Sequence, residues 1–166
     1  MKFTKIRDVK TPSRANAGDA GVDFYVPSYT TELAEKISKV GAVYIDNQNI
    51  KIPPQSSVCI PSGIKVIVPF GKALIAKNKS GIASKKGLVV GACVIDYFYA
   101  GEVHIDIHNI GDSVQVIDFG TKLVQFVLQD VDLSEYEEIS NDEYINIMEH
   151  PENTRGAGGF GSTGIQ

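Results

Sequence analysis

Residues branched at Cβ dominate the apolar part of this chain and constrain its fold more than any other feature. The sequence contains 19 Ile and 17 Val against only 6 Leu. Branching at Cβ restricts χ1 and suits the pleated, half-buried surface of a strand better than a helix. Short apolar segments alternate with turns that contain Pro and Gly, as in sandwiches and barrels. We therefore predict an all-β fold, a β-sandwich or a barrel, with one short helix.

Three segments give this prediction local detail. Residues 30–39 carry apolar residues at helical spacing behind threonines, so we expect the short helix there. Residues 88–95 form a continuous apolar run, which predicts a strand buried on both faces. Residues 102–110 alternate between apolar and polar residues, which predicts a half-buried strand. The apolar residues expected to share its inner face are Val103, Ile105, Ile107 and Ile110.

Length and composition limit the organisation and the partners. The 166 residues match one domain and contain no linker, so we expect a single domain over 1–166. The chain contains neither a run of about 20 apolar residues nor a secretory signal, so we expect no membrane partner and a cytoplasmic location, host cytoplasm if the source is a virus. The net charge of −4 and the scattered basic residues argue against a nucleic-acid partner. Cys59 and Cys93 lie in apolar runs without metal-ligand spacing, so we expect buried small hydrophobes in a reducing compartment.

The C-terminal segment 152–166 differs from the rest of the sequence. It holds five of the sixteen glycines together with Arg155 and Phe160. A glycine-rich end is most simply a frayed terminus. A flexible arm that closes over a ligand would need the same features: backbone freedom, one cation and one flat apolar side chain.

Two internal segments and this tail carry groups suited to phosphate chemistry. Residues 79–83 follow a strand and could begin a helical turn, whose backbone N–H groups and flanking lysines would bind an anion. The charge of the lysines by itself favours a solvated loop. Asp96 ends an apolar run and Tyr99 follows three residues later, either as turn residues or as a base beside an aromatic ring. Phosphate donors, a base and stacking surfaces together are what a nucleoside triphosphate hydrolase requires.

Five segments, in order, resemble the motifs of the homotrimeric dUTP diphosphatase (dUTPase) family. They are Ala20-Gly21-Val22-Asp23-Phe24; Lys79-Ser80-Gly81-Ile82-Ala83; Gly91-Ala92-Cys93-Val94-Ile95-Asp96 through Tyr99, Gly101 and Glu102; Gly120 with Lys122-Leu123-Val124-Gln125; and Arg155-Gly156-Ala157-Gly158-Gly159-Phe160-Gly161-Ser162-Thr163-Gly164. The last motif is the most specific of the five.

The resemblance implies an all-β subunit, a jelly-roll-like distorted β-barrel with one short helix. Three such subunits would form a homotrimer with active sites at the subunit interfaces and a C-terminal arm, about 152–166, exchanged between subunits. It implies hydrolysis of dUTP to dUMP and pyrophosphate with Mg²⁺, which keeps uracil out of DNA and supplies dUMP for thymidylate synthesis.

The resemblance also implies a role for each matching residue. Asp96 would be the general base, which activates a water for in-line attack on the α-phosphorus. Tyr99 would lie under the deoxyribose and exclude a 2′-hydroxyl. Uracil would be read by the backbone of Ala92, Cys93, Val94 and Ile95. The phosphates would be bound by Lys79, Ser80, Gly81 and Gln125 and by the arm residues Arg155, Gly161, Ser162 and Thr163. Phe160 would cover the base, and Asp23 would reach Mg²⁺ through water.

The sequence departs from the family pattern at several positions. Lys79 stands where Arg is usual, which keeps the charge but loses a bidentate fork. Cys93 replaces a frequent Gly and Phe98 a frequent Asp. The stretch 28–44 is longer than usual, which predicts an inserted surface helix.

Two other functions remain open at this point. A dCTP deaminase of the same superfamily would share the scaffold, and release of ammonia from dCTP would identify it. A regulatory trimer that only binds nucleotide would have no need of a base such as Asp96.

Overall fold

The computed structural model describes residues 1–152 and 156. The chain divides into two units, Met1–Asp132 and Leu133–Gln166, and each is described by itself. Every strand among the described residues lies in the first unit. That the whole chain serves as one functional domain stays a prediction.

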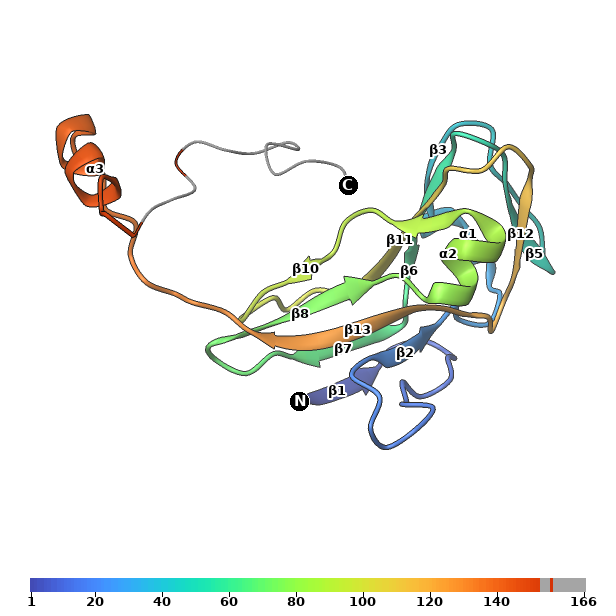
Figure 1. The fold of residues 1–166 in the computed structure, drawn as a ribbon. Helices are drawn as coiled ribbons and strands as arrows, with labels where there is room; N and C mark the ends of the chain where they lie inside the picture. The colour runs from blue at the N-terminus through green and yellow to red at the C-terminus, as the bar shows by residue number, and fades with distance from the viewer. Residues whose placement is uncertain (153–155, 157–166) are drawn as a thin grey trace. The chain divides into compact units, whose positions relative to one another are not determined.

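The first unit is built from short strands and two short helices (Figure 1). The strands are β1 Lys2–Lys5, β2 Val22–Tyr25, β3 Ser38–Val40, β4 Tyr44–Ile45, β5 Asn49–Ile52, β6 Ser57–Pro61, β7 Ile64–Ile67, β8 Lys72–Lys77, β9 Leu88–Val90, β10 Val94–Ile95, β11 His104–Asn109, β12 Gln115–Asp118 and β13 Lys122–Asp130. The helices are α1 Thr31–Lys36 and α2 Ser80–Lys86.

The strands form two main sheets of four strands each, in the orders β10-β8-β13-β2 and β3-β6-β11-β9. Smaller sheets, β1-β7 and β12-β5-β4, complete the unit, and all pairings are antiparallel. Strands that follow one another along the chain, such as β8 and β9, belong to different sheets, as in a jelly roll. The predicted all-β, jelly-roll-like class is confirmed.

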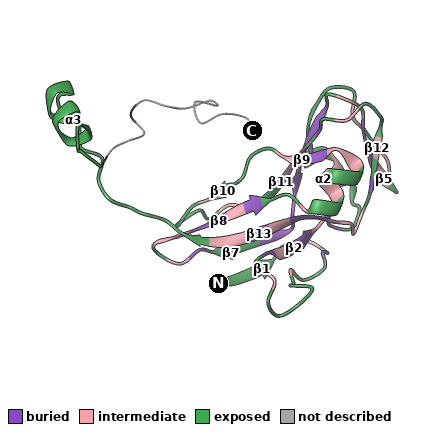
Figure 2. Cartoon of the chain, viewed as in Figure 1, coloured by how far each residue is buried: buried purple, intermediate pink, exposed green. Residues whose placement is uncertain are grey.

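The core consists of the inward side chains of these sheets, and Figure 2 shows the buried residues along the strands of the first unit. Phe24 on β2 and Phe126 on β13 pack with their ring centroids 4.5 Å apart. Both side chains are almost fully buried. The contact between the two rings adds to the effect of burying their apolar surface and stabilises the pairing of β2 with β13.

Strand β11 shows the predicted alternation, with one correction. Ile105 and Ile107 are buried on the inner face, and Val103 just before the strand is buried as well. Ile110 is exposed, and the prediction that it faces inward is wrong, because Asn109 takes the next inward position. The Asn109 side-chain amide donates to the carbonyls of Ile52 at 2.8 Å and Ser113 at 2.9 Å, which satisfies the buried polar group.

The apolar run 88–95 is not the single buried strand that we expected. It divides into β9 and β10, joined through the exposed residues Gly91, Ala92 and Cys93. β9 pairs with β11 and β10 pairs with β8, so the run passes from one sheet to the other. The prediction that both cysteines are buried is also wrong, because Cys93 is exposed and Cys59 only half-buried.

Helix α1 lies within the expected segment 30–39. The Thr30 side-chain oxygen caps it by accepting the Leu33 N–H at 3.0 Å, and Leu33 is buried. α2 begins at Ser80, where the sequence indicated the start of a helical turn.

The second unit contains helix α3, Asn141–Met148, which the sequence analysis missed. Ser140 accepts the Glu143 N–H at 3.2 Å, and Asp142 and Glu143 in the first turn complement the helix dipole. Among the described residues, no helix has the length and apolar character needed to cross a membrane.

Candidate active site

The first part of the site is an ionic cluster built by β2, β13 and the residue before α2. Asp23 on β2 receives Lys79 Nζ on one carboxylate oxygen at 2.5 Å and Lys122 Nζ on the other at 3.0 Å. The Asp23 side chain is only 6% exposed. Burial raises the pKa of this carboxyl, but the hydrogen bonds from Lys79 and Lys122 outweigh burial and leave the pKa below its ordinary value. Asp23 therefore holds two ammonium groups at the edge of the sheet.

A β-bulge brings Lys122 into this cluster. The pairing of β13 with β2 matches Lys122 with Tyr25 and Gln125 with Asp23, and the register shifts between Lys122 and Val124. Without the extra residue, positions 122 and 125 would point to opposite faces, because side chains alternate along a strand. The bulge places both polar side chains on the face that carries Asp23.

Gln125 is fixed beside the cluster by its neighbours. Its side-chain Nε2 donates to the Asn78 carbonyl at 2.8 Å. A Cβ at Gly21 would lie 2.2 Å from Gln125 Oε1, so a larger residue at position 21 would displace the Gln125 side chain. The sequence-predicted residues Asp23, Lys79 and Gln125 are thus brought together.

The second part of the site is a small pocket of about 170 Å³ at the turn between β9 and β10. Its predicted members are Ala92, Cys93, Val94, Ile95, Asp96 and Tyr99, and the sequence analysis missed Cys59, His104 and Asp106. Cys59, His104 and Asp106 come from strands β6 and β11, and Cys59 pairs directly with Asp106. Burial and the nearby Asp106 charge raise the pKa of the Cys59 thiol, which keeps it neutral. A larger hollow of about 450 Å³ beside β2 is lined by Val22 and Phe24 of the first motif but by no residue to which the resemblance assigns a role.

Asp106 holds the turn between β9 and β10. Its carboxylate accepts the Ala92 N–H at 2.7 Å, and its backbone carbonyl accepts the Gly91 N–H at 3.0 Å. His108 Nε2 lies 3.4 Å from the same carboxylate. A Cβ at Gly91 would lie 2.3 Å from Asp106 Oδ2 and from His108 Nε2, so a larger residue there would push both side chains away from the turn.

Asp96 and Tyr99 lie in the exposed turn after β10. The Tyr99 N–H donates to the Asp96 carbonyl at 3.3 Å, which closes the turn. Phe98 has φ of 68°, a left-handed conformation that is uncommon for a bulky residue. Its ring lies 3.9 Å from that of Tyr97, centroid to centroid, and the residue is 84% exposed.

The two parts of the site lie at opposite edges of one sheet. β10, which leads to Asp96, and β2, which carries Asp23, are the outer strands of β10-β8-β13-β2. Three strand spacings separate them, about 14 Å. The arm residues Arg155, Phe160, Gly161, Ser162 and Thr163 lie outside the described residues.

No group of three His, Cys, Asp or Glu side chains within residues 1–152 is arranged to hold a metal ion. Both oxygens of Asp23 carry ammonium groups, so a cation beside it would compete with Lys79 and Lys122. In this arrangement Asp23 does not fit a metal contact, and its role toward Mg²⁺ stays a prediction.

The Asp23 cluster should stabilise the fold in a pH-dependent way. Because the pKa of Asp23 is lower in the folded chain than in the unfolded chain, its contribution is complete above the unfolded value and is lost as the pH falls through the folded value. At pH 7 we expect Asp23→Asn to lower the free energy of unfolding by about 2 kcal/mol, the size of a charged hydrogen bond. Urea denaturation of both proteins at pH 7 and pH 3, at one protein concentration, should show the difference shrinking in acid. An equal difference at both pH values would contradict this account.

Comparison with solved structures identifies the fold. A mutant dUTPase of Staphylococcus bacteriophage 80alpha with dUpNHpp has a TM-score of 0.73 at 20% identity, over 99% of this chain and 98% of that chain. The native EIAV dUTPase has a TM-score of 0.61 at 22% identity, over 84% and 96%. The fold is therefore that of solved dUTPases.

Sequence comparison identifies the family. The dUTPase family model matches residues 43–164. The deoxyuridine 5′-triphosphate nucleotidohydrolase of Mycolicibacterium vanbaalenii is 29% identical over 161 residues, which cover 95% of this chain and 90% of the relative. That of Rickettsia rickettsii is 32% identical over 142 residues, which cover 84% and 88%. This chain belongs to the dUTPase family.

Proposed function

We propose that this protein hydrolyses dUTP to dUMP and pyrophosphate, and so keeps uracil out of DNA and supplies dUMP for thymidylate synthesis. The observation that carries the proposal is that Asp96, Tyr99 and the β9–β10 turn line one pocket. A carboxylate, an aromatic ring and backbone polar groups are what binding a deoxynucleoside and activating water require. Family membership supports the substrate.

The base would be read by the backbone of β10. The Ala92 N–H already donates to Asp106, and the Cys93 carbonyl accepts the Ala76 N–H at 2.7 Å. Residues in an antiparallel pair alternate between hydrogen-bonded and non-hydrogen-bonded positions, so Val94 takes the next, non-hydrogen-bonded position opposite Ile75. Its N–H and C=O point away from β8, at the outer edge of the sheet. Val94 is therefore the best candidate to pair with uracil, with Cys93 and Ile95 beside it.

Asp96 would act as the general base. It would accept a proton from a water whose oxygen bonds the α-phosphorus, while the bond from that phosphorus to the α,β-bridging oxygen breaks and pyrophosphate leaves. Phosphoryl transfer depends mainly on positioning and charge neutralisation, which suits one carboxylate surrounded by several donors. Tyr99 would lie under the deoxyribose.

The phosphates would be bound by the ionic cluster and by the arm. Lys79, Ser80, Gly81 and Gln125 would hold the inner phosphates. From the arm, Arg155, Gly161, Ser162 and Thr163 would hold the γ-phosphate and Phe160 would cover uracil. Mg²⁺ would arrive as part of the substrate, bound to the triphosphate and to water, which matches its preference for phosphate and water oxygens. A water-mediated contact to Asp23 would require Lys79 or Lys122 to turn toward the phosphates.

The working form would be a homotrimer with active sites at its interfaces. Two observations support the need for neighbouring subunits. The pocket of about 170 Å³ is smaller than the roughly 300–1,000 Å³ of sites that enclose a ligand. The pocket at the turn between β9 and β10 and the ionic cluster also lie at opposite edges of one sheet.

A pyrophosphate-release assay with dUTP, UTP, dTTP and dCTP in parallel tests the function. We expect release from dUTP and little from the other three, because the β10 edge reads uracil and Tyr99 excludes the ribose. Ammonia should be measured from dCTP in the same samples. Release of ammonia, or equal release of pyrophosphate from all four nucleotides, would contradict the proposal.

A further inference from the structure

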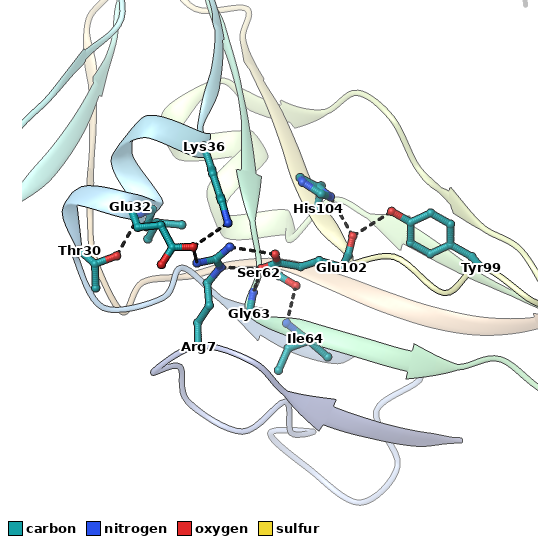
Figure 3. Close-up of polar contacts among 11 residues, drawn as sticks. Arg7, Thr30, Glu32, Lys36, Ser62, Gly63, Ile64, Tyr99, Glu102 and His104 are labelled. Atoms are coloured by element: carbon teal, nitrogen blue, oxygen red, sulfur yellow. Dashed lines mark hydrogen bonds and ion pairs between the residues drawn. The ribbon is translucent and has the colours of Figure 1, made fainter.

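The orientation of the Tyr99 ring depends on its own loop. The Tyr99 hydroxyl donates to the Glu102 carbonyl at 3.0 Å, and His104 Nδ1 lies 2.8 Å from the same oxygen (Figure 3). A Cβ at Gly101 would lie 2.4 Å from the Tyr99 hydroxyl oxygen, so the ring folds back over a glycine. Tyr99 is 43% exposed, so these few contacts, more than a surrounding core, fix its position.

The Glu102 side chain anchors this loop to the barrel. Its carboxylate receives Arg7 Nε at 2.9 Å and Arg7 Nη2 at 3.2 Å, a bidentate pair. The Gly63 N–H donates to the same carboxylate at 2.7 Å. The Arg7 and Glu102 side chains are each only 13% exposed, and Figure 3 shows them between α1 and the Tyr99 loop. Residues far apart in sequence thus hold the Glu102 backbone in place.

The contacts of Arg7 toward α1 are weaker. Arg7 Nη1 lies 3.4 Å from Glu32, and Glu32 pairs with Lys36 at 2.6 Å. The Glu32 side chain is 64% exposed, and exposed ion pairs contribute little. Helix α1 therefore contacts Arg7 only weakly, and the bidentate pair with Glu102 is the stronger interaction.

We propose that Arg7 and Glu102 are positioning residues that hold the Tyr99 ring and thereby set the selectivity for deoxyribose over ribose. The proposal rests on the proposed function, in which Tyr99 excludes the 2′-hydroxyl. Steric exclusion requires a ring that cannot yield. If the Glu102 carbonyl shifts, the exposed Tyr99 ring can turn aside. The value of kcat/KM then rises for a ribonucleotide by a larger factor than it falls for a deoxyribonucleotide.

The test compares kcat/KM for dUTP and UTP in the full-length protein and three variants. Arg7→Lys keeps the charge but loses the fork, Glu102→Gln keeps the shape but loses the charge, and Tyr99→Phe removes the hydroxyl without touching the buried pair. Each should lower the dUTP-to-UTP ratio about tenfold, roughly the effect of one hydrogen bond. Lys36→Met, which alters only the exposed end of the network, is the matched control and should keep the wild-type ratio.

The outcomes separate this inference from the proposed function. Wild-type protein that fails to hydrolyse dUTP refutes the function itself. Wild-type protein that hydrolyses dUTP, with an unchanged ratio in folded Arg7→Lys and Glu102→Gln, refutes the positioning role. If both of those variants fail to fold, as judged by circular dichroism, an unchanged ratio in Tyr99→Phe overturns it. In the same variants the dissociation constant for UMP, divided by that for dUMP, should also fall, because the effect acts on binding of the sugar.

Discussion

Asp96→Asn is expected to lower kcat for dUTP by about 100- to 10,000-fold, the usual contribution of a general base, while nucleotide binding is kept. Asparagine has nearly the shape of aspartate and can still orient a water, but it cannot accept the proton. Asp96 is exposed beside the pocket after β10, so the substitution disturbs no core contact. Pyrophosphate release measures turnover, and calorimetric titration with dUMP measures binding.

Asp112→Asn is the matched control for this experiment. Asp112 is an exposed loop carboxylate before β12 and does not line the pocket. We expect this variant to behave as wild type. Near-normal turnover in Asp96→Asn would refute the assignment of Asp96 as the base.

Removal of residues 152–166 is expected to reduce kcat/KM for dUTP by about 100-fold or more, since misplacing a reacting group by about 1 Å already costs that much. The segment contains Arg155, Ser162 and Thr163 as candidate γ-phosphate ligands, and Phe160 as the candidate cover of the base. The strands of the first unit end at Asp130, so the barrel should keep its fold. The assay is pyrophosphate release, and light scattering after size-exclusion chromatography should report an intact trimer.

A shorter truncation controls for the loss of chain length. Removing only residues 165–166 leaves every proposed arm ligand in place and should preserve activity. If the longer truncation turns over dUTP normally, the arm is unnecessary for catalysis. If it dissociates into monomers, the arm holds the subunits together, which would contradict the expected division of roles.

The sequence predicted much of the fold because period-two alternation is a local signal. It placed Ile105 and Ile107 inside, since side chains along a strand alternate between faces. It could not place Asn109, whose burial depends on carbonyls of two other segments. The switch of the run 88–95 between sheets at Gly91 could not be predicted, because it depends on Asp106 in β11, the partner strand of β9. Helix α3 does carry a local signal, a serine three residues before a glutamate, which is typical of a helix N-terminus.

Within the candidate site, only residues that belong to the five motifs could be predicted from the sequence. The structure places Asp96 and Tyr99 on one pocket and brings Asp23, Lys79 and Gln125 together, and the roles that the resemblance implies for them stay predictions. Asp106 lies on a polar strand face that looked merely solvated. Arg7 is near the N-terminus, outside all five motifs, and its pairing with Glu102 is set by tertiary structure alone.

The bulge in β13 also determines how this chain can be aligned with its relatives. Leu123 and Val124 are both buried although they are neighbours in sequence, so the inside and outside of the strand exchange at that point. An alignment displaced by one position here would match Lys122 to an inward apolar residue and hide the second cation beside Asp23. The two halves of β13 therefore have separate registers, and a gap placed between them changes which residues are counted as equivalent.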